Sequence, residues 1–118
     1  MAVAIPGTDF TFQVLFLDAA NVPIAVNSPV VEVSQFLPTG AKDVLQATTP
    51  MNPVAGDIGR YSFVFSIPTT LDPGITIYGL MQGENPTTLD ILIYEEQVDL
   101  VMNDMEGRMR AHFISYSE

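Results

Sequence analysis

Nine prolines punctuate the chain and leave few windows long enough for a stable helix. Each proline lies at the edge of an apolar run or between two such runs: Pro6, Pro23, Pro29, Pro38, Pro50, Pro53, Pro68, Pro73 and Pro86. Because proline has no backbone N–H, it is largely excluded from helix interiors and central strands. The spacing therefore predicts short strands joined by turns, with almost no window for a helix.

The clearest strand pattern lies in residues 61–67, where one face carries aromatic and aliphatic side chains and the other carries Ser62 and Ser66. This period-two alternation is typical of a half-buried strand. Further strands are expected at residues 10–17, 30–37, 43–47, 75–82 and 89–102. The apolar parity of the two clearest strands predicts four core residues: Phe63, Phe65, Ile75 and Ile77. This pattern predicts an all-β fold, a single antiparallel β-sandwich of about seven strands.

Length and composition indicate one folded domain that spans residues 1–118. Hydrophobic residues make up 47% of the chain and charged residues only 15%, a balance that excludes disorder as the default. The chain has no cysteine, so neither a disulfide nor a cysteine-based zinc site can support its core. Stability must come from apolar burial.

Charge restricts the partners that the protein can bind. Fourteen acidic residues against four basic ones give a formal net charge of −10, which argues against nucleic acid because no cationic patch can form. Residues 1–6 lack a basic region and end in Pro6, so no secretory signal is expected. No apolar run is long enough to span a membrane. The low charge density favours an oligomer or a docked subunit over a free monomer.

The sequence offers no catalytic constellation, and we expect neither enzyme activity nor a cofactor. Its sole histidine, His112, is the only candidate base for a nucleophile. Glu95 and Glu96 are adjacent on an expected strand, so they point to opposite faces and cannot act as a carboxylate pair. We therefore assign no catalytic residue.

Two ligand classes remain open from the residues alone. Calcium could be held by oxygen ligands in converging turns: Asp18, Asn21, Asp57, Glu84, Asn85 and Asp90. These residue types are also common turn formers, and none of the turns has the spacing of a calcium loop, so no metal site is assigned. Tyr78 or Tyr94, if exposed, could provide a stacking platform for a sugar, which makes a soluble carbohydrate-binding β-sandwich module the alternative function.

The last quarter of the chain can be read in two ways. Val98, Met102, Met105 and Met109 have helical spacing, whereas residues 105–113 alternate strictly between apolar or small and polar side chains. We favour two strands that turn over Asn103-Asp104, because Gly107 would weaken a helix.

Residues 105–118 can form either an interface strand or arm, or an ordinary closing strand whose arginines offset acidic residues of the same domain. Arg108, Arg110 and His112 share one strand face of an otherwise acidic chain, and this placement favours pairing with an acidic surface of a neighbouring subunit. Apolar residues of this segment offer contact area. The expected interface residues are Arg108, Met109, Arg110, His112, Phe113, Ile114 and Tyr116.

Two motifs resemble the late strands of bacterial and phage immunoglobulin-like domains, in which a G-x-Y strand precedes a P-G turn and another strand. They are the runs that begin at Gly59-Arg-Tyr61 and at Asp72-Pro73-Gly74. Residues 107–114 are similar to closing strands of accessory structural proteins in tailed-phage particles. The resemblance implies an immunoglobulin-like sandwich located in the virion, as a head decoration, neck or tail-associated protein that is present in multiple copies.

Overall fold

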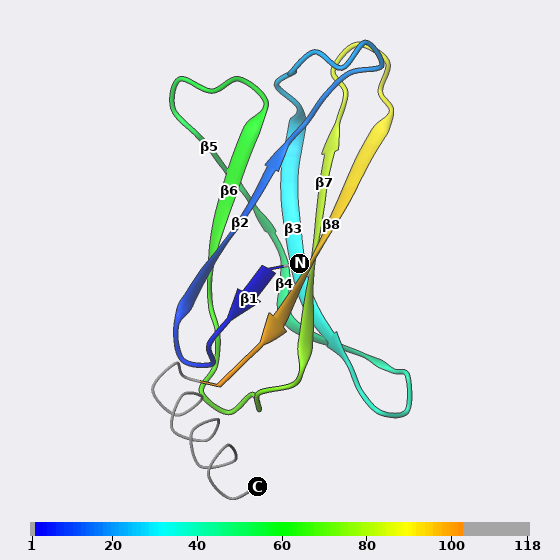
Figure 1. The fold of residues 1–118 in the computed structure, drawn as a ribbon. Coiled ribbons are helices and arrows are strands. Elements are labelled where there is room, and N and C mark those ends of the chain that lie inside the picture. The colour runs from blue at the N-terminus through cyan, green and yellow to red at the C-terminus, as the bar shows by residue number, and fades with distance from the viewer. Residues whose placement is uncertain (1, 103–118) are drawn as a thin grey trace, which may run out of the picture.

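The computed structural model describes residues 2–102, which form eight strands and no helix. The strands are β1 (Ala2–Ala4), β2 (Asp9–Leu15), β3 (Asn27–Phe36), β4 (Lys42–Pro50), β5 (Asn52–Pro53), β6 (Arg60–Ser66), β7 (Thr76–Glu84) and β8 (Ile91–Leu100). A large sheet of five strands has the order β1-β8-β7-β3-β4, and a small sheet of three has the order β2-β6-β5. The two sheets pack face to face (Figure 1), so the prediction of an all-β sandwich is confirmed.

All six strands expected from the alternation are present, but two short strands escaped prediction. β1 has only three residues and β5 only two, one of which is Pro53, so neither leaves a periodic pattern. The expectation of a purely antiparallel sandwich is wrong in one place. β1 runs parallel to β8, with Ala2 opposite Val98 and Ala4 opposite Leu100, because the chain then turns and enters the small sheet as β2.

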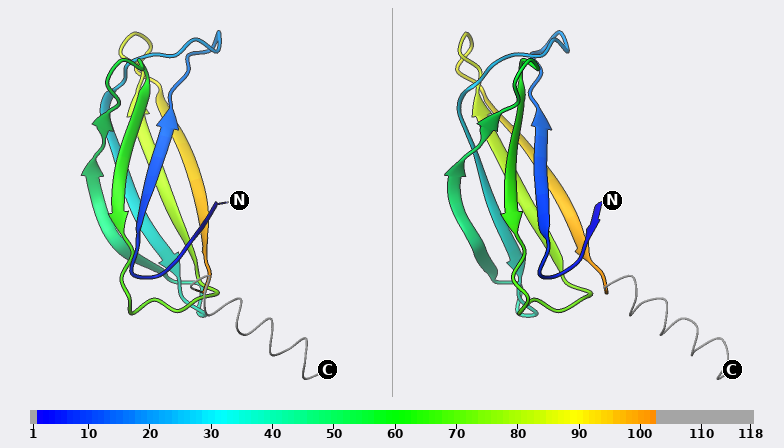
Figure 2. Two further views of the ribbon diagram at one scale, coloured as in Figure 1. Left: turned by 60° about the vertical axis from the view of Figure 1, so that its left-hand side comes forward. Right: turned by 90° about the vertical axis from the view of Figure 1, so that its left-hand side faces the viewer.

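At each lateral edge of the sandwich the chain passes from the large sheet to the small sheet, as the views in Figure 2 show. On one side it passes from β4 to β5 through Met51, which is buried. On the other side it passes from β1 to β2 around Gly7. Because β1 pairs only with residues 98–100 of β8, the rest of that edge has no neighbouring strand within the described residues.

The core forms where aromatic side chains of the small sheet meet glycines of the large sheet. Phe12 and Phe16 are fully buried, and they lie against Gly79 and Gly83 of β7. A Cβ at Gly79 would lie 2.4 Å from the ring of Phe12, and a Cβ at Gly83 would lie 3.2 Å from the ring of Phe16. A glycine within a strand often marks such a close approach.

Two of the four predicted core residues are confirmed as buried. Phe65 is 5% exposed and Ile77 is inaccessible, whereas Phe63 and Ile75 are half-buried and pack against the margin of the core. Phe63 lies beyond the end of β5, where the small sheet is only two strands wide, and Ile75 precedes the first residue of β7. The assignment of faces is therefore correct, but the two residues lie at the margin.

Candidate docking surface

The predicted interface residues lie outside the described part of the chain. They are Arg108, Met109, Arg110, His112, Phe113, Ile114 and Tyr116, and the expected turn at Asn103-Asp104 precedes them. The surfaces described below all lie within residues 2–102. In this region, no helix could span a membrane.

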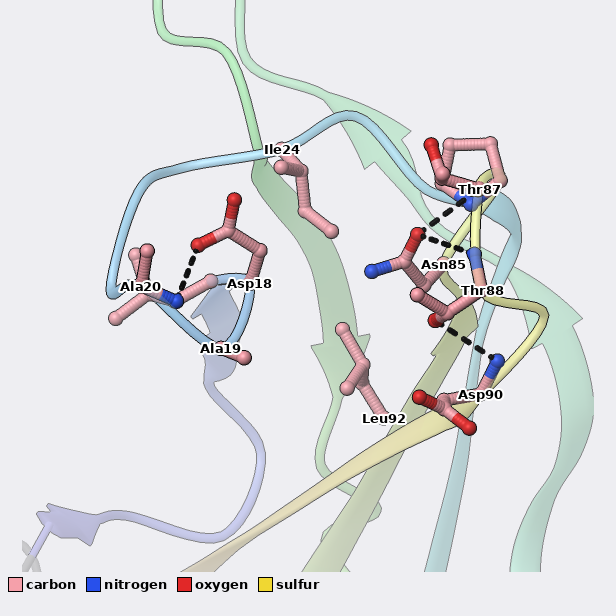
Figure 3. A pocket seen from close by; sticks show the side chains of 11 residues that line it. Asp18, Ala19, Ala20, Ile24, Asn85, Thr87, Thr88, Asp90 and Leu92 are labelled. Atoms are coloured by element: carbon pink, nitrogen blue, oxygen red, sulfur yellow. Dashed lines mark hydrogen bonds between the residues drawn. The ribbon is translucent and has the colours of Figure 1, made fainter.

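Three of the residues considered as calcium ligands line one hollow at the end of the sandwich. Asp18 comes from the loop between β2 and β3, and Asn85 and Asp90 come from the loop between β7 and β8. The hollow has a volume of about 550 Å³, and Ile24 and Leu92 lie between the two loops (Figure 3). Within residues 2–102, no three His, Asp or Glu side chains gather closely enough to hold a metal ion.

The side chains of Asp18 and Asn85 have structural partners within their own loops. The Oδ1 atom of Asp18 accepts hydrogen bonds from the backbone N–H groups of Ala20 and Val22, at 2.8 and 3.0 Å. The Oδ1 atom of Asn85 accepts from Thr87 and Thr88, at 2.9 and 3.2 Å. Such bonds are how Asp and Asn stabilise turns, so turn formation explains these residues without a ligand.

The two tyrosines considered for sugar stacking lie on opposite faces of the large sheet. Tyr78 is on the outer face and contacts Phe36 edge-on, with ring centroids 5.2 Å apart. Tyr94 has the parity of the inner face and contacts Phe16 edge-on at 5.6 Å. They cannot form a common platform.

Glu95 and Glu96 also lie on opposite faces, as their adjacency predicts. The register places Glu95 opposite Leu80 on the outer face and Glu96 opposite Gly79 on the inner face. Partial burial raises the pKa of the Glu96 carboxyl above its usual value of 4.5, because desolvation disfavours the charged form.

The G-x-Y motif has a structural role at the start of β6. Gly59 has a φ of +87°, and a Cβ there would lie 2.9 Å from the carbonyl oxygen of Ile24. Its own carbonyl accepts a hydrogen bond from the N–H of Phe16 at 2.8 Å. Two residues later, the Tyr61 hydroxyl accepts a buried bond from the N–H of Val26 at 3.1 Å. The motif thus holds the connection between β2 and β3 against the small sheet.

The outer face of the large sheet carries a group of apolar side chains from four strands. We call this group the outer apolar surface; its residues are Val30, Phe36, Val44, Tyr78, Leu80, Ile91 and Ile93. Four of them are strongly exposed: Phe36 by 53%, Val44 by 46%, Ile91 by 55% and Ile93 by 56%. Apolar groups of this kind on a sheet are typical of interaction sites.

Acidic side chains interrupt and surround the outer apolar surface. Glu32 forms an ion pair with Lys42, and Asp99 accepts a hydrogen bond from Thr76 at 2.7 Å. Glu95 is exposed on the same face. The other basic residue of the described region, Arg60, is paired with Asp57 on a distant loop. A partner that supplies cationic groups would therefore fit this border.

Sequence reasoning missed the outer apolar surface, although a signal was present. In residues 91–93, Ile-Leu-Ile, both faces of the strand are apolar. In residues 77–80, Ile77 faces inward while Tyr78 and Leu80 face outward. Strands covered on both faces have this composition. The pattern was thus a signal that the outer face of the large sheet is apolar as well.

The edge of β8 is the second unusual feature. Leu100 donates its N–H to Ile75 on the β7 side, whereas Val101 donates to Ala4 on the β1 side, both at 2.8 Å. Backbone groups alternate in direction along an antiparallel strand, and the register from 91 to 99 is unbroken. The N–H and C=O groups of Ile91, Ile93 and Glu95 therefore point away from β7, toward an edge that no described strand covers.

Comparisons with models of known families, with curated proteins and with solved structures give no match for this chain.

Proposed function

We propose that the protein is a non-enzymatic structural protein that assembles with protein partners, including further copies of itself, through the outer apolar surface. The observation that carries the proposal is the exposure of Phe36, Val44, Ile91 and Ile93 on one face of the large sheet. Burial of these side chains against a partner would remove apolar area from water, which is the main driving force of association.

Backbone strain beside the surface adds support. Leu89 has a φ of +65°, and its side chain is 64% exposed next to Ile91. A bulky residue in the left-handed region costs free energy, and such strain often accompanies a functional contact. In an assembly, Leu89 would extend the apolar contact beyond the end of β8.

We further propose an immunoglobulin-like topology. If β1 to β8 are taken in order as strands A, B, C, C′, D, E, F and G, the small sheet has the order B-E-D. The large sheet then has C′-C-F-G, with A beside G. Immunoglobulin-like domains divide these strands between their sheets in a similar way, although strand A often lies beside B.

The proposed setting is the particle of a tailed phage, as a head decoration, neck or tail-associated protein. This part depends on the resemblance of the motifs at Gly59-Arg-Tyr61 and Asp72-Pro73-Gly74 to phage immunoglobulin-like domains. The contacts of Gly59 and Tyr61 give the first motif a reason to be retained in such a domain. A virion subunit repeated many times needs a docking face, which the outer apolar surface would supply.

Sedimentation velocity over a concentration series tests the proposal. The test variant is Phe36→Ser combined with Val44→Ser, and the matched control is Val64→Ser, because Val64 is 54% exposed on the outer face of the small sheet. We expect the wild type and the control to form the same oligomer at similar concentrations. The double variant should form it only at a protein concentration at least tenfold higher. A wild type that stays monomeric throughout contradicts self-assembly; if it also binds a glycan array, the carbohydrate-binding alternative replaces it.

A further inference from the structure

We propose that the open edge of β8, residues 91–97, accepts residues 105–116 of a second copy as an added strand. This inference rests on the proposed assembly function and names the contact that gives the assembly its geometry. Addition of an extended segment to a sheet edge is a common mode of recognition, in which backbone hydrogen bonds provide affinity.

The edge lacks most of the features that normally prevent strand addition, and its charged residues are limited to Glu95 and Glu96. Residues 91–97 contain no proline and no lysine, and their pairing with β7 has no bulge. Three residues, Ile91, Ile93 and Glu95, present outward N–H and C=O groups, and two of them, Ile91 and Ile93, carry strongly exposed apolar side chains. An exposed, regular and apolar edge is a template for another strand unless it is covered.

The opposite edge of the large sheet shows what protection looks like. β4 begins at Lys42 and ends at Pro50, and its pairing with β3 shifts register between Val31 and Ser34. Charge, proline and a bulge all discourage edge-to-edge pairing. The contrast within one sheet singles out β8 as the edge that is left available.

The occupant is identified by charge and by pattern. Both basic residues of the described region, Lys42 and Arg60, are already ion-paired, whereas β8 presents Glu95 at its open edge. Residues 105–113 alternate as a strand does and carry Arg108 and Arg110 on one parity. Opposite charges across neighbouring strands stabilise pairing. At about 3.3 Å per residue, residues 105–116 would span roughly 40 Å, more than the roughly 23 Å of the open edge.

The position of β1 favours a second copy over the same chain. β1 pairs with residues 98–100 of β8, and the N–H of Val101 is bonded to Ala4. Both edges of β8 are therefore occupied at the end where the chain leaves it. A tight hairpin back along β8 would collide with β1, whereas a segment from another copy can approach the open edge directly.

Two full-length variants test the backbone contact. Glu95→Pro removes an outward N–H without touching the bonds to β7, and Glu95→Thr removes the same charge but keeps the N–H. We expect Glu95→Pro to raise the protein concentration needed for assembly at least tenfold in sedimentation velocity, and Glu95→Thr to shift it much less. If Glu95→Pro fails to fold by circular dichroism, the pair Arg108→Glu with Arg110→Glu replaces it, with a comparable loss expected at low salt.

Cross-linking then identifies the occupant. Because the chain has no cysteine, Ile93→Cys and Met109→Cys proteins can be mixed and treated with a short bismaleimide, and we expect a cross-linked pair that contains one copy of each. Cross-links that form only within a chain carrying both substitutions would assign the edge to its own segment and overturn the proposal. A folded Glu95→Pro protein that assembles at the same concentration as the wild type would also overturn the proposal. If assembly is lost in the Phe36 and Val44 double variant but retained in Glu95→Pro, strand addition fails while the proposed function stands.

Discussion

The two sheets of the sandwich use their residues in opposite ways. The small sheet supplies large aromatic side chains to the core and turns Thr11, Gln13, Ser62 and Ser66 to the outside. The large sheet supplies glycines and aliphatic side chains to the core and turns the outer apolar surface to the outside. Two apolar residues, Leu15 and Val64, interrupt the polar outer pattern of the paired part of β2 and β6.

This difference separates the requirements of folding from those of assembly. A sheet that packs on the core with one face and meets water with the other needs a polar outer face, and the small sheet has one. The large sheet already buries Val31, Val33, Ile77 and Val98 on its inner side, so its outer apolar residues are not needed for that core. A partner docked on the second face, as proposed, would explain their presence.

The largest expected effect comes from breaking the inner contact between the sheets. Gly79→Ala places a Cβ 2.4 Å from the ring of Phe12, which is fully buried and has no room to move. We expect a loss of about 3 kcal/mol in the free energy of unfolding, measured by urea denaturation.

A control and a rescue make this prediction specific. Gly40→Ala has no atom within 4 Å of the new Cβ but has a φ of +89°, so it should cost only about 1 kcal/mol from backbone strain. Phe12→Leu should cost less in the Gly79→Ala background than in the wild type, because the smaller side chain relieves the clash. Additive costs would show that Phe12 and Gly79 are not in contact.

A smaller effect is expected at the polar group that the small sheet buries. Tyr61→Phe leaves the buried N–H of Val26 without its acceptor at 3.1 Å, and the expected loss in the free energy of unfolding is about 1–3 kcal/mol. Tyr78→Phe removes a hydroxyl from the outer apolar surface and should cost less than about 0.5 kcal/mol. Equal losses of unfolding free energy in the two variants would contradict the structural role of the G-x-Y motif.

The smallest effect concerns a carboxyl on the inner face of the large sheet. Burial raises the pKa of Glu96, so the ionised form destabilises the fold as the pH rises through that pKa. Glu96→Gln should therefore raise the melting temperature at pH 7 by more than Glu95→Gln does, and this advantage should vanish as the pH falls below 4.5. An advantage that is independent of pH would contradict the burial of Glu96.

The sequence predicted the longer strands of both sheets but not how the two sheets pack against each other. Proline spacing and alternation predicted the six longer strands, because both patterns depend on neighbouring residues along one chain. The contact of Phe12 with Gly79 joins residues far apart in sequence, although the glycine inside β7 was a signal for it. Pairing of β1 with β8 leaves no local pattern at all. The docking surface required the register of four strands, which alternation alone does not give.

The most direct test of the central claim compares two valines on the two outer faces. Val44→Cys and Val64→Cys introduce single thiols at positions that are 46% and 54% exposed, one on each sheet, into a chain without cysteine. Maleimide labelling rates are measured on dilute and on assembled protein. The account predicts similar rates for both thiols when dilute, and at least tenfold slower labelling of the Val44→Cys thiol alone upon assembly. Equal rates in the assembled protein, or slower labelling at position 64, would contradict docking through the large sheet.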